Sequence, residues 1–450
     1  MIKFNYFNCI KDNYLKDGLK QDKLTKCGAE KSIKKTIINA SRDMMGWVNL
    51  PYQSEAQVEE IELFGKKISR LYERFVVVGL GGSSLGTKAV YKAIKAQKRN
   101  DCKVDFLDNI DPVQFAKKMQ RYNLKKTMFN VITKSGTTVE TLSMFAIIVE
   151  QLKKELGDDF FINIVVTTSK GNALSDYCQK NNIKVYEIPN DVGGRYSVLT
   201  PVGLLPCAVM GVELAKLLGG AKKVLENFKQ EPTSKNLCLL SANTMYNYFV
   251  NGKNEFVFLN YGKNILNLCN YYIQLLAESL GKSQTLSGKQ NKTFFTTYKV
   301  QGVKFQHSVL QNFVEGDNNK LFCFLTVAKK QDEVKVPKLK DSVLDALLPR
   351  SLNLLFKTEC LATSASLKNA NKPSFELALE DITDQTLGEF LYYCQLSTAI
   401  LGELMQVNAY NQPGVESQKI FTKALISPKN FENKFELVSN LTKDKTKYEI

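Results

Sequence analysis

The stretch FVVVGLGGSSLGTKAVYKAIKAQ at residues 75–97 decides the fold class of this chain. Residues 75–78 form a short apolar run rich in β-branched side chains, and they lead directly into a glycine-rich segment at 79–86. The residues that follow place apolar side chains at helical spacing. The stretch therefore predicts a buried strand, a glycine turn and a helix in immediate succession.

The same alternation continues along the chain. After this first unit we expect strands at 103–107, 128–133 and 161–167, with helices at 113–121 and 139–150. A second series begins near Asn254, with strands at 255–260, 322–327 and 375–379 and long helices at 265–280 and 386–407. Strands and helices that alternate through short loops predict parallel sheets with helices on both faces, which is an α/β fold.

The series divide the chain into four expected parts. Residues 1–60 carry no strand-like run and are expected to form a helical N-terminal arm. Residues 61–230 and 231–410 are expected to form two α/β lobes, separated by a surface connection at 231–235. Residues 411–450 are expected to form a C-terminal helical segment that completes the functional site.

Composition places the protein among folded, water-soluble chains. Its 450 residues are 44% hydrophobic and 24% charged, which excludes disordered and collagen-like classes. No window reaches the roughly 20 apolar residues of a membrane-spanning helix, and no signal peptide is recognisable. Ten cysteines without a CxxC pair argue against zinc and disulfide frameworks and favour a reducing, cytoplasmic location. The 61 Lys and Arg against 45 Asp and Glu give +16, which raises the question of an anionic partner.

Two polar loops are candidates for binding phosphate. The loop at 79–86 lies between a strand and a helix, where backbone amides and the helix N-terminus attract anions, although a ligand-free turn explains it equally well. It lacks the third glycine of the dinucleotide fingerprint, and this absence weakens the hypothesis that the protein is a nicotinamide-dependent dehydrogenase. The loop ITKSGTTVET at 132–141 offers a cluster of hydroxyls, of which helix capping accounts for only one or two.

Three charged or titratable residues are candidates for chemistry. Arg195 follows two glycines and suits the stabilisation of an oxyanion, or else is a structural arginine. Glu278 lies in an apolar helix four residues after Gln274; a carboxylate in such surroundings suits a general base, unless it is an exposed residue paired with Lys282. His307 is the single histidine, so any imidazole chemistry must use it and a multi-histidine metal site is excluded.

Read in order, these segments resemble the glucose-6-phosphate isomerase (phosphoglucose isomerase) family. The resemblance rests on GLGGSSLG, TKSGTTVET, VGGRYS, ESLGK and QPGVESQK, and it spans residues 75 to 419. It implies two flavodoxin-like parallel-sheet lobes of the sugar-isomerase (SIS) type. It also implies a metal-free and cofactor-free aldose–ketose isomerase that interconverts glucose 6-phosphate and fructose 6-phosphate, an activity of glycolysis and gluconeogenesis.

The resemblance also implies roles for individual residues. Glu278 would move the proton between C2 and C1 through a cis-enediol, Arg195 would stabilise the enediolate, and His307 and Lys419 would assist ring opening. Substrate-binding residues would be Gly82, Ser83, Thr133, Lys134, Ser135, Thr137, Thr138, Gly194, Gln274 and Gln412. In this family the histidine comes from the neighbouring subunit, so a homodimer is implied.

Departures from the family pattern leave alternatives open. Ser84 and Thr87 stand where many relatives have Asp and Pro, and the segment after His307 matches only approximately. An isomerase that also accepts mannose 6-phosphate and a non-catalytic phosphosugar sensor both remain alternatives. The sequence contains no recognisable helix-turn-helix or basic arm, so it does not indicate a nucleic-acid partner. We assign the +16 charge to solvated surface lysines.

Overall fold

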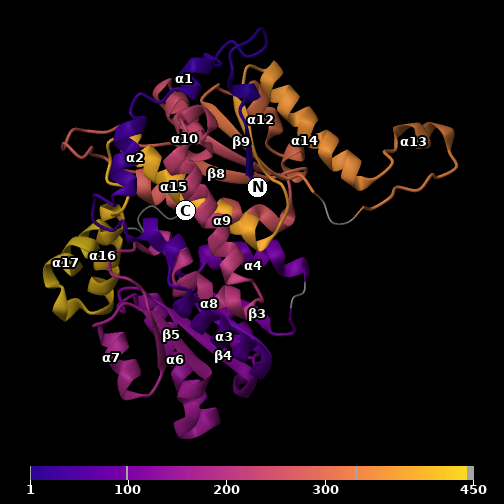
Figure 1. Ribbon diagram of the computed structural model, residues 1–450. Coiled ribbons are helices and arrows are strands. Elements are labelled where there is room, and N and C mark those ends of the chain that lie inside the picture. Colours follow the sequence, from indigo (N-terminus) through magenta and orange to yellow (C-terminus); the bar gives the residue numbers. More distant parts are fainter. Residues whose placement is uncertain (1, 98–99, 330–332, 443–450) are drawn as a thin grey trace. The chain divides into compact units, whose positions relative to one another are not determined.

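The computed structural model describes residues 2–97, 100–329 and 333–442, and these form two compact units, 1–409 and 410–450. The larger unit contains two separate five-stranded sheets. Figure 1 shows β3, β4 and β5 in one group and β8 and β9 in another. The described residues include no helix that has the length and apolar character needed to cross a membrane.

The first sheet is parallel throughout and has the strand order β3-β2-β4-β5-β6. In chain order this is 2-1-3-4-5, the flavodoxin-like arrangement that the sequence predicts. Its strands are β2 Arg74–Val78, β3 Lys103–Leu107, β4 Thr127–Ile132, β5 Ile164–Thr168 and β6 Lys184–Glu187. The order changes direction between β2 and β4, so the loops after these two strands flank the point where such sheets bind ligands.

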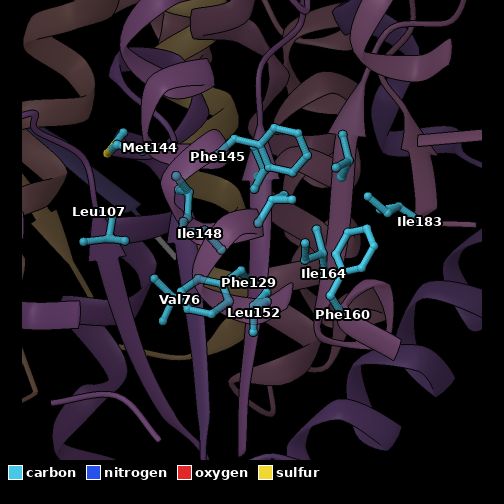
Figure 2. Close-up of a cluster of buried hydrophobic side chains, with 14 of the residues drawn as sticks. Val76, Leu107, Phe129, Met144, Phe145, Ile148, Leu152, Phe160, Ile164 and Ile183 are labelled. Carbon is cyan, nitrogen blue, oxygen red and sulfur yellow. The ribbon is translucent and has the colours of Figure 1, made fainter. Parts of the chain in front are cut away.

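Helices cover both faces of this sheet because its central strands are apolar on both sides. The core around Phe129 and Ile164 is completed by Ile148 and Leu152 of the helix α6, as Figure 2 shows. The helices of this region are α3 Glu55–Leu71, α4 Leu85–Ile94, α5 Pro112–Met119, α6 Val139–Leu156, α7 Ala173–Lys180 and α8 Pro201–Val209.

The second sheet has the order β1-β10-β9-β7-β8 and is parallel except for β1. Its strands are β1 Ile2–Asn5, β7 Glu255–Asn260, β8 Thr296–Gln301, β9 Lys320–Val327 and β10 Ser374–Leu379. The accompanying helices are α9 Leu214–Gln230, α10 Leu237–Val250, α11 Leu266–Leu280, α12 Leu310–Glu315, α13 Ser342–Leu347, α14 Leu352–Asn369 and α15 Asp384–Leu404. Two α/β lobes are therefore confirmed.

The N-terminal arm departs from its expected helical character. It contains the helices α1 Gln21–Thr25 and α2 Glu30–Ile38, but it begins with the strand β1, which pairs antiparallel with β10 from Ile2↔Leu379 onward. The backbone N–H of Ile2 also donates to Glu389 Oε2 at 3.1 Å. Only Ile2 of the four strand residues is buried, so the sequence has no apolar run there to reveal the strand. The four-part division at residues 60, 230 and 410 stays a prediction.

The smaller unit, 410–450, contains the helices α16 Glu416–Ile426 and α17 Glu432–Thr442 within its described residues. A short 3-10 turn, Pro413–Val415, precedes α16. The described part of this segment is therefore helical, as the sequence predicts.

Candidate active site

The glycine loop after β2, residues 79–86, lies against the segment that carries Gly194 and Arg195. The two backbones are so close that position 82 has no room for a side chain. Gly81 has a φ of 56°, a left-handed conformation that glycine adopts without strain. A Cβ on Gly82 would lie 2.3 Å from the carbonyl oxygen of Gly194 and 2.7 Å from the backbone nitrogen of Arg195. The glycines of GLGGSSLG and VGGRYS thus allow the two backbones to touch, and this contact brings Arg195 next to the first loop.

Arg195 is 3% exposed and is held by neutral partners. Its Nε donates to Ser279 Oγ and its Nη2 donates to the carbonyl oxygen of Ala409, both at 2.7 Å. Its Nη1 lies 3.5 Å from Glu278 Oε2. A hydroxyl and a main-chain carbonyl therefore fix the direction of the guanidinium, and the Glu278 carboxylate lies beside it.

Glu278 lies near the end of α11, where its carboxylate contacts Gln274 and Arg195. Gln274, one turn earlier, donates from Nε2 to Glu278 Oε1 at 3.3 Å, and Arg195 approaches the other oxygen. A Cβ on Gly81 would come within 3.1 Å of Gln274 Nε2, so the glycine loop adjoins this pair. The structure brings Glu278, Gln274, Arg195 and the first loop into one cluster.

Two expectations for Glu278 need correction. The sequence suggests a carboxylate enclosed in apolar surroundings, but its side chain is 34% exposed because α11 presents this residue at the edge of the buried face. The alternative, an ion pair with Lys282, is also wrong. Lys282 Nζ donates to the main-chain carbonyl of Glu278 instead, which leaves the carboxylate to Gln274 and Arg195.

Lys282 is a buried cation that the sequence analysis did not single out. Burial, followed by the nearby Arg195 guanidinium, lowers its pKa to about 8 against the opposing effect of Glu278. Its position in the ESLGK segment could have drawn attention to it, but a lysine near a helix end is ordinarily solvated. Ser279 and Ala409 were missed for a similar reason, since neither residue type signals an arginine partner.

The second loop, between β4 and α6, arranges its hydroxyls in pairs. Thr133 Oγ1 and Thr138 Oγ1 are 2.9 Å apart, and Ser135 Oγ accepts from both the backbone and the hydroxyl of Thr137, at 3.2 and 3.0 Å. Gly136 has a φ of 63° and packs against Asn172. Because the loop precedes the N-terminus of α6, its hydroxyls and amides suit the binding of an anion.

Lys134 connects this loop to the segment that carries Arg195. Its Nζ donates to the carbonyl oxygen of Asn190 at 2.9 Å. Partial burial lowers its pKa, and Asp191 opposes that shift. The side chain therefore bridges two loops at the same edge of the first sheet.

The remaining candidates are Ser83 of the first loop, His307, and two residues of the smaller unit. Ser83 ends the 3-10 turn Gly81–Ser83 and is half-buried. His307 is exposed at the end of the turn Lys304–His307, and no hydrogen bond or ion pair joins it to Arg195 or Glu278 within the described residues. In the smaller unit Gln412 is half-buried, and Lys419 is exposed on α16 with its Nζ 2.8 Å from Glu416 Oε1.

Comparison with known families gives this geometry a context. The family model described as phosphoglucose isomerase matches residues 56–440. The chain belongs to the phosphoglucose isomerase family. A relative named glucose-6-phosphate isomerase, from Carboxydothermus hydrogenoformans, is 36% identical over 411 residues, which cover 89% of each chain. Another of that name, from Methanocaldococcus jannaschii, is 33% identical over 77% of this chain and 83% of its own.

Solved structures agree with this membership. A hypothetical protein from Thermus thermophilus has a TM-score of 0.85 at 29% identity, covering 95% of this chain and all of its own. A glucose-6-phosphate isomerase from Chlamydia trachomatis has a TM-score of 0.76 at 21% identity, covering 91% of this chain and 81% of its own, and it shares the fold. The two-lobed α/β architecture that the sequence predicts is confirmed.

Proposed function

We propose that this chain is a glucose-6-phosphate isomerase, an enzyme that interconverts the aldose and ketose 6-phosphates by moving a proton between C2 and C1. Its family membership supports the substrate and the reaction. The observation that carries the proposal is the approach of Arg195 Nη1 to Glu278 Oε2 at 3.5 Å, beside the glycine loop. A carboxylate base next to a fixed guanidinium matches the needs of an enediolate reaction.

The proton transfer assigns complementary roles to these two residues. The Glu278 carboxylate takes the proton from C2 of the open-chain aldose, and the carbonyl oxygen at C1 becomes the enediolate oxygen. Arg195 stabilises that negative charge, because two neutral acceptors hold it in place without cancelling its own charge. Return of the proton from Glu278 to C1, with transfer of the hydroxyl proton from O2 to O1, yields the ketose.

Phosphate binding is assigned to the two loops that end β2 and β4. Ser83 and the hydroxyls of Thr133, Ser135, Thr137 and Thr138 would donate to the phosphate oxygens, with Lys134 nearby. The close contact at Gly82 and Gly194 sets the position of these loops against the base. Gln274 holds one oxygen of the Glu278 carboxylate and, with Gln412, would line the sugar site.

Ring opening is assigned to His307 and Lys419. The exposure of His307, together with its lack of a bond to the Arg195 cluster within the described residues, supports a histidine supplied by a second copy of the chain. Apolar side chains on and around α13 and α14 are exposed to an extent unusual for a monomer, which supports a homodimer. These include Leu339, Val343, Leu347 and Leu361, at 59%, 70%, 76% and 60% exposed.

The assigned base is tested by Glu278→Gln. We expect kcat for fructose 6-phosphate formation to fall by about 10²–10⁴-fold, because the amide cannot accept the C2 proton, while phosphosugar binding persists. Turnover is measured in the presence of EDTA, since the proposed reaction uses no metal. The exposed Glu150, which pairs with Lys154 on α6, provides the control Glu150→Gln, expected to retain full activity.

The outcomes separate the alternatives. Full activity of Glu278→Gln would contradict the assigned base. Binding of glucose 6-phosphate without turnover in the wild type would favour the phosphosugar sensor, and faster turnover of mannose 6-phosphate would redefine the substrate.

A mixing experiment tests the shared site. Glu278→Gln and His307→Ala are each expected to be inactive alone. In a mixed dimer, one of the two sites would combine an intact Glu278 with an intact His307 from the other subunit, so reassociated mixtures should regain about a quarter of wild-type activity. Activity that stays at the level of the separate variants would show that both residues act within one chain.

We also assign the protein to the cytoplasm. The described structure holds all ten cysteines as free thiols, and most are buried. Such thiols are typical of a reducing compartment.

A further inference from the structure

A second basic region lies on the flank of the first lobe, away from the loops assigned to the phosphosugar. A cavity of about 500 Å³ opens between the edge strand β3, its neighbour β2 and the helices α4 and α5. Its lining includes six cations and one carboxylate, Asp105; the cations are Arg74, Lys88, Lys92, Lys95, Lys103 and Lys118. A volume of this size falls in the range of small-molecule sites.

The backbone places these cations on one surface. Lys88, Lys92 and Lys95 are spaced at i, i+4 and i+7 along α4 and the turn that follows it, so they share one face. Arg74 and Lys103 are register partners on the neighbouring strands β2 and β3. Their two positive charges therefore lie side by side and repel each other, although Arg74 also packs over the ring of Tyr122 at 4.9 Å.

Few carboxylates offset these charges. Lys88 Nζ lies 2.6 Å from Asp108 Oδ2, and Lys118 Nζ lies 3.2 Å from Asp105 Oδ1. Within the described part of the chain, Arg74, Lys92, Lys95 and Lys103 form no ion pair. The pKa of Lys92 is lowered by burial and then by the nearby charges of Lys95, Lys88 and Lys118, with Asp105 opposing. Two of the six cations of the cavity are therefore paired with carboxylates, and the other four form no ion pair within the described residues.

Ordinary explanations account for only part of this cluster. Lys103 protects an exposed sheet edge from pairing with another chain, and a lysine near the end of α4 is favoured by the helix dipole. Neither explains why β2, β3, α4 and α5 all direct cations to one hollow. Five of the six are lysines, whose compact ammonium charges suit phosphate oxygens without imposing a planar geometry.

We propose that this cavity, lined by Arg74, Lys92, Lys95 and Lys103, binds a small anion that carries a chain of two or more phosphates. The four cations without ion-pair partners carry more positive charge than a monophosphate can neutralise. The site is distinct from the proposed phosphosugar site, because the loops of that site follow the carboxyl ends of β2 and β4 whereas Arg74 and Lys103 begin β2 and β3. Anion binding at this cavity would give a function to part of the +16 net charge of the sequence.

Calorimetric titration of the full-length protein with inorganic tripolyphosphate tests the proposal. We expect saturable binding that weakens as ionic strength rises and that persists with excess glucose 6-phosphate present. Orthophosphate should bind much more weakly. The double variant Lys92→Gln/Lys95→Gln should weaken tripolyphosphate binding by about tenfold or more, because two direct charge contacts are lost. Its thermal unfolding midpoint confirms that it folds, and Lys95→Gln/Lys103→Gln replaces it if it does not.

A matched control removes the same charge elsewhere. Lys31 and Lys35 are exposed neighbours on α2, and Lys31→Gln/Lys35→Gln should change the affinity by less than about twofold. Equal weakening by both double variants would show a diffuse charge effect and overturn the proposal. Displacement by glucose 6-phosphate, equal affinity for orthophosphate, or no binding by the wild type would also overturn it.

Two further ligands identify the source of the phosphate chain. Equal affinity for ATP and tripolyphosphate would show that the phosphates alone are recognised, whereas tighter binding of ATP would point to a nucleotide resting against Tyr91, which also lines the cavity. A single-stranded oligonucleotide that binds more tightly than either, and that loses affinity in the Lys92→Gln/Lys95→Gln variant, would replace the small anion with a nucleic acid.

Discussion

The cations of the proposed active site and those of the flanking cavity differ in how they are held. Arg195, Lys282 and Lys134 each donate to a main-chain carbonyl oxygen, those of Ala409, Glu278 and Asn190. Of the flanking cations, Lys118 also donates to a main-chain carbonyl, that of Phe106, but Lys92 and Lys95 lie over the ring of Tyr91 instead, at 5.5 and 5.6 Å.

The two kinds of contact suit the cations to different tasks: directing a charge at a reacting atom, or attracting a charged ligand. A neutral carbonyl fixes the direction of a cation without cancelling its charge, so the charge stays available for an anion that forms during a reaction. Cations without such anchors attract a charged ligand but do not direct it toward a bond. The first arrangement suits catalysis and the second suits binding.

The largest expected effect comes from breaking the anchored geometry with Arg195→Lys. A lysine keeps the charge but cannot reach Ser279, Ala409 and the enediolate together, so kcat/KM should fall by about 10²–10³-fold. Steady-state kinetics measure the loss. The flanking variant Lys92→Gln/Lys95→Gln, assayed without added polyphosphate, should keep its activity. If Arg195→Lys were fully active, charge alone would suffice and the proposed distinction would fail.

The pH dependence of stability sharpens the comparison. Because the folded-state pKa of Lys282 is about 8, below its ordinary value of 10.5, the unfolded chain binds more protons between these values and stability rises with pH. Relative to Lys282→Met, the wild type should gain up to about 3 kcal/mol in free energy of unfolding between pH 8 and 10.5. Urea unfolding at several pH values measures it. A difference between the two proteins that does not change with pH would show that Lys282 is solvated.

A smaller effect is expected where the loops touch. Gly82→Ala places a methyl group against the Gly194 carbonyl and should lower the free energy of unfolding by about 1–3 kcal/mol. Gly194→Ala is the matched control, because a Cβ there meets no atom within 4 Å; its change should stay within about 0.5 kcal/mol. Urea midpoints compare the two variants. Equal stabilities would mean that the loops separate freely and do not fix Arg195.

The sequence predicts the central strands well because burial on both faces leaves an uninterrupted apolar run. The expected strand 255–260 coincides with the central strand β7. The edge strand β3 also coincides with its expected range, 103–107, because three of its five residues are buried. The edge strands β6 and β8 were missed, since their residues are mostly exposed or half-buried and the backbone pairing that forms them has no sequence period. The expected strand 161–167 begins too early, because Gly157–Asn163 forms 3-10 turns and β5 starts only at Ile164.

For the site, the sequence places Gln274 and Glu278 correctly on one face, because helical spacing determines it. It could not predict that Ser279 and Ala409 hold Arg195, because those contacts join residues 84 and 214 positions apart. Nor could it predict the flanking cavity. Six cations scattered between residues 74 and 118 become neighbours only once the strands pair and α4 and α5 pack beside them.

The pairing of β1 with β10 has a consequence for how the protein is made. Ile2 leaves the ribosome well before its partner Leu379, because 377 positions of the chain separate the two residues. At about 5–20 residues per second, β1 waits on the order of 20–75 s for β10. The first sheet, which uses only residues 74–187, can form during that interval. The four-residue length of β1 and the exposed Lys3 within it limit its pairing with other nascent chains while it waits.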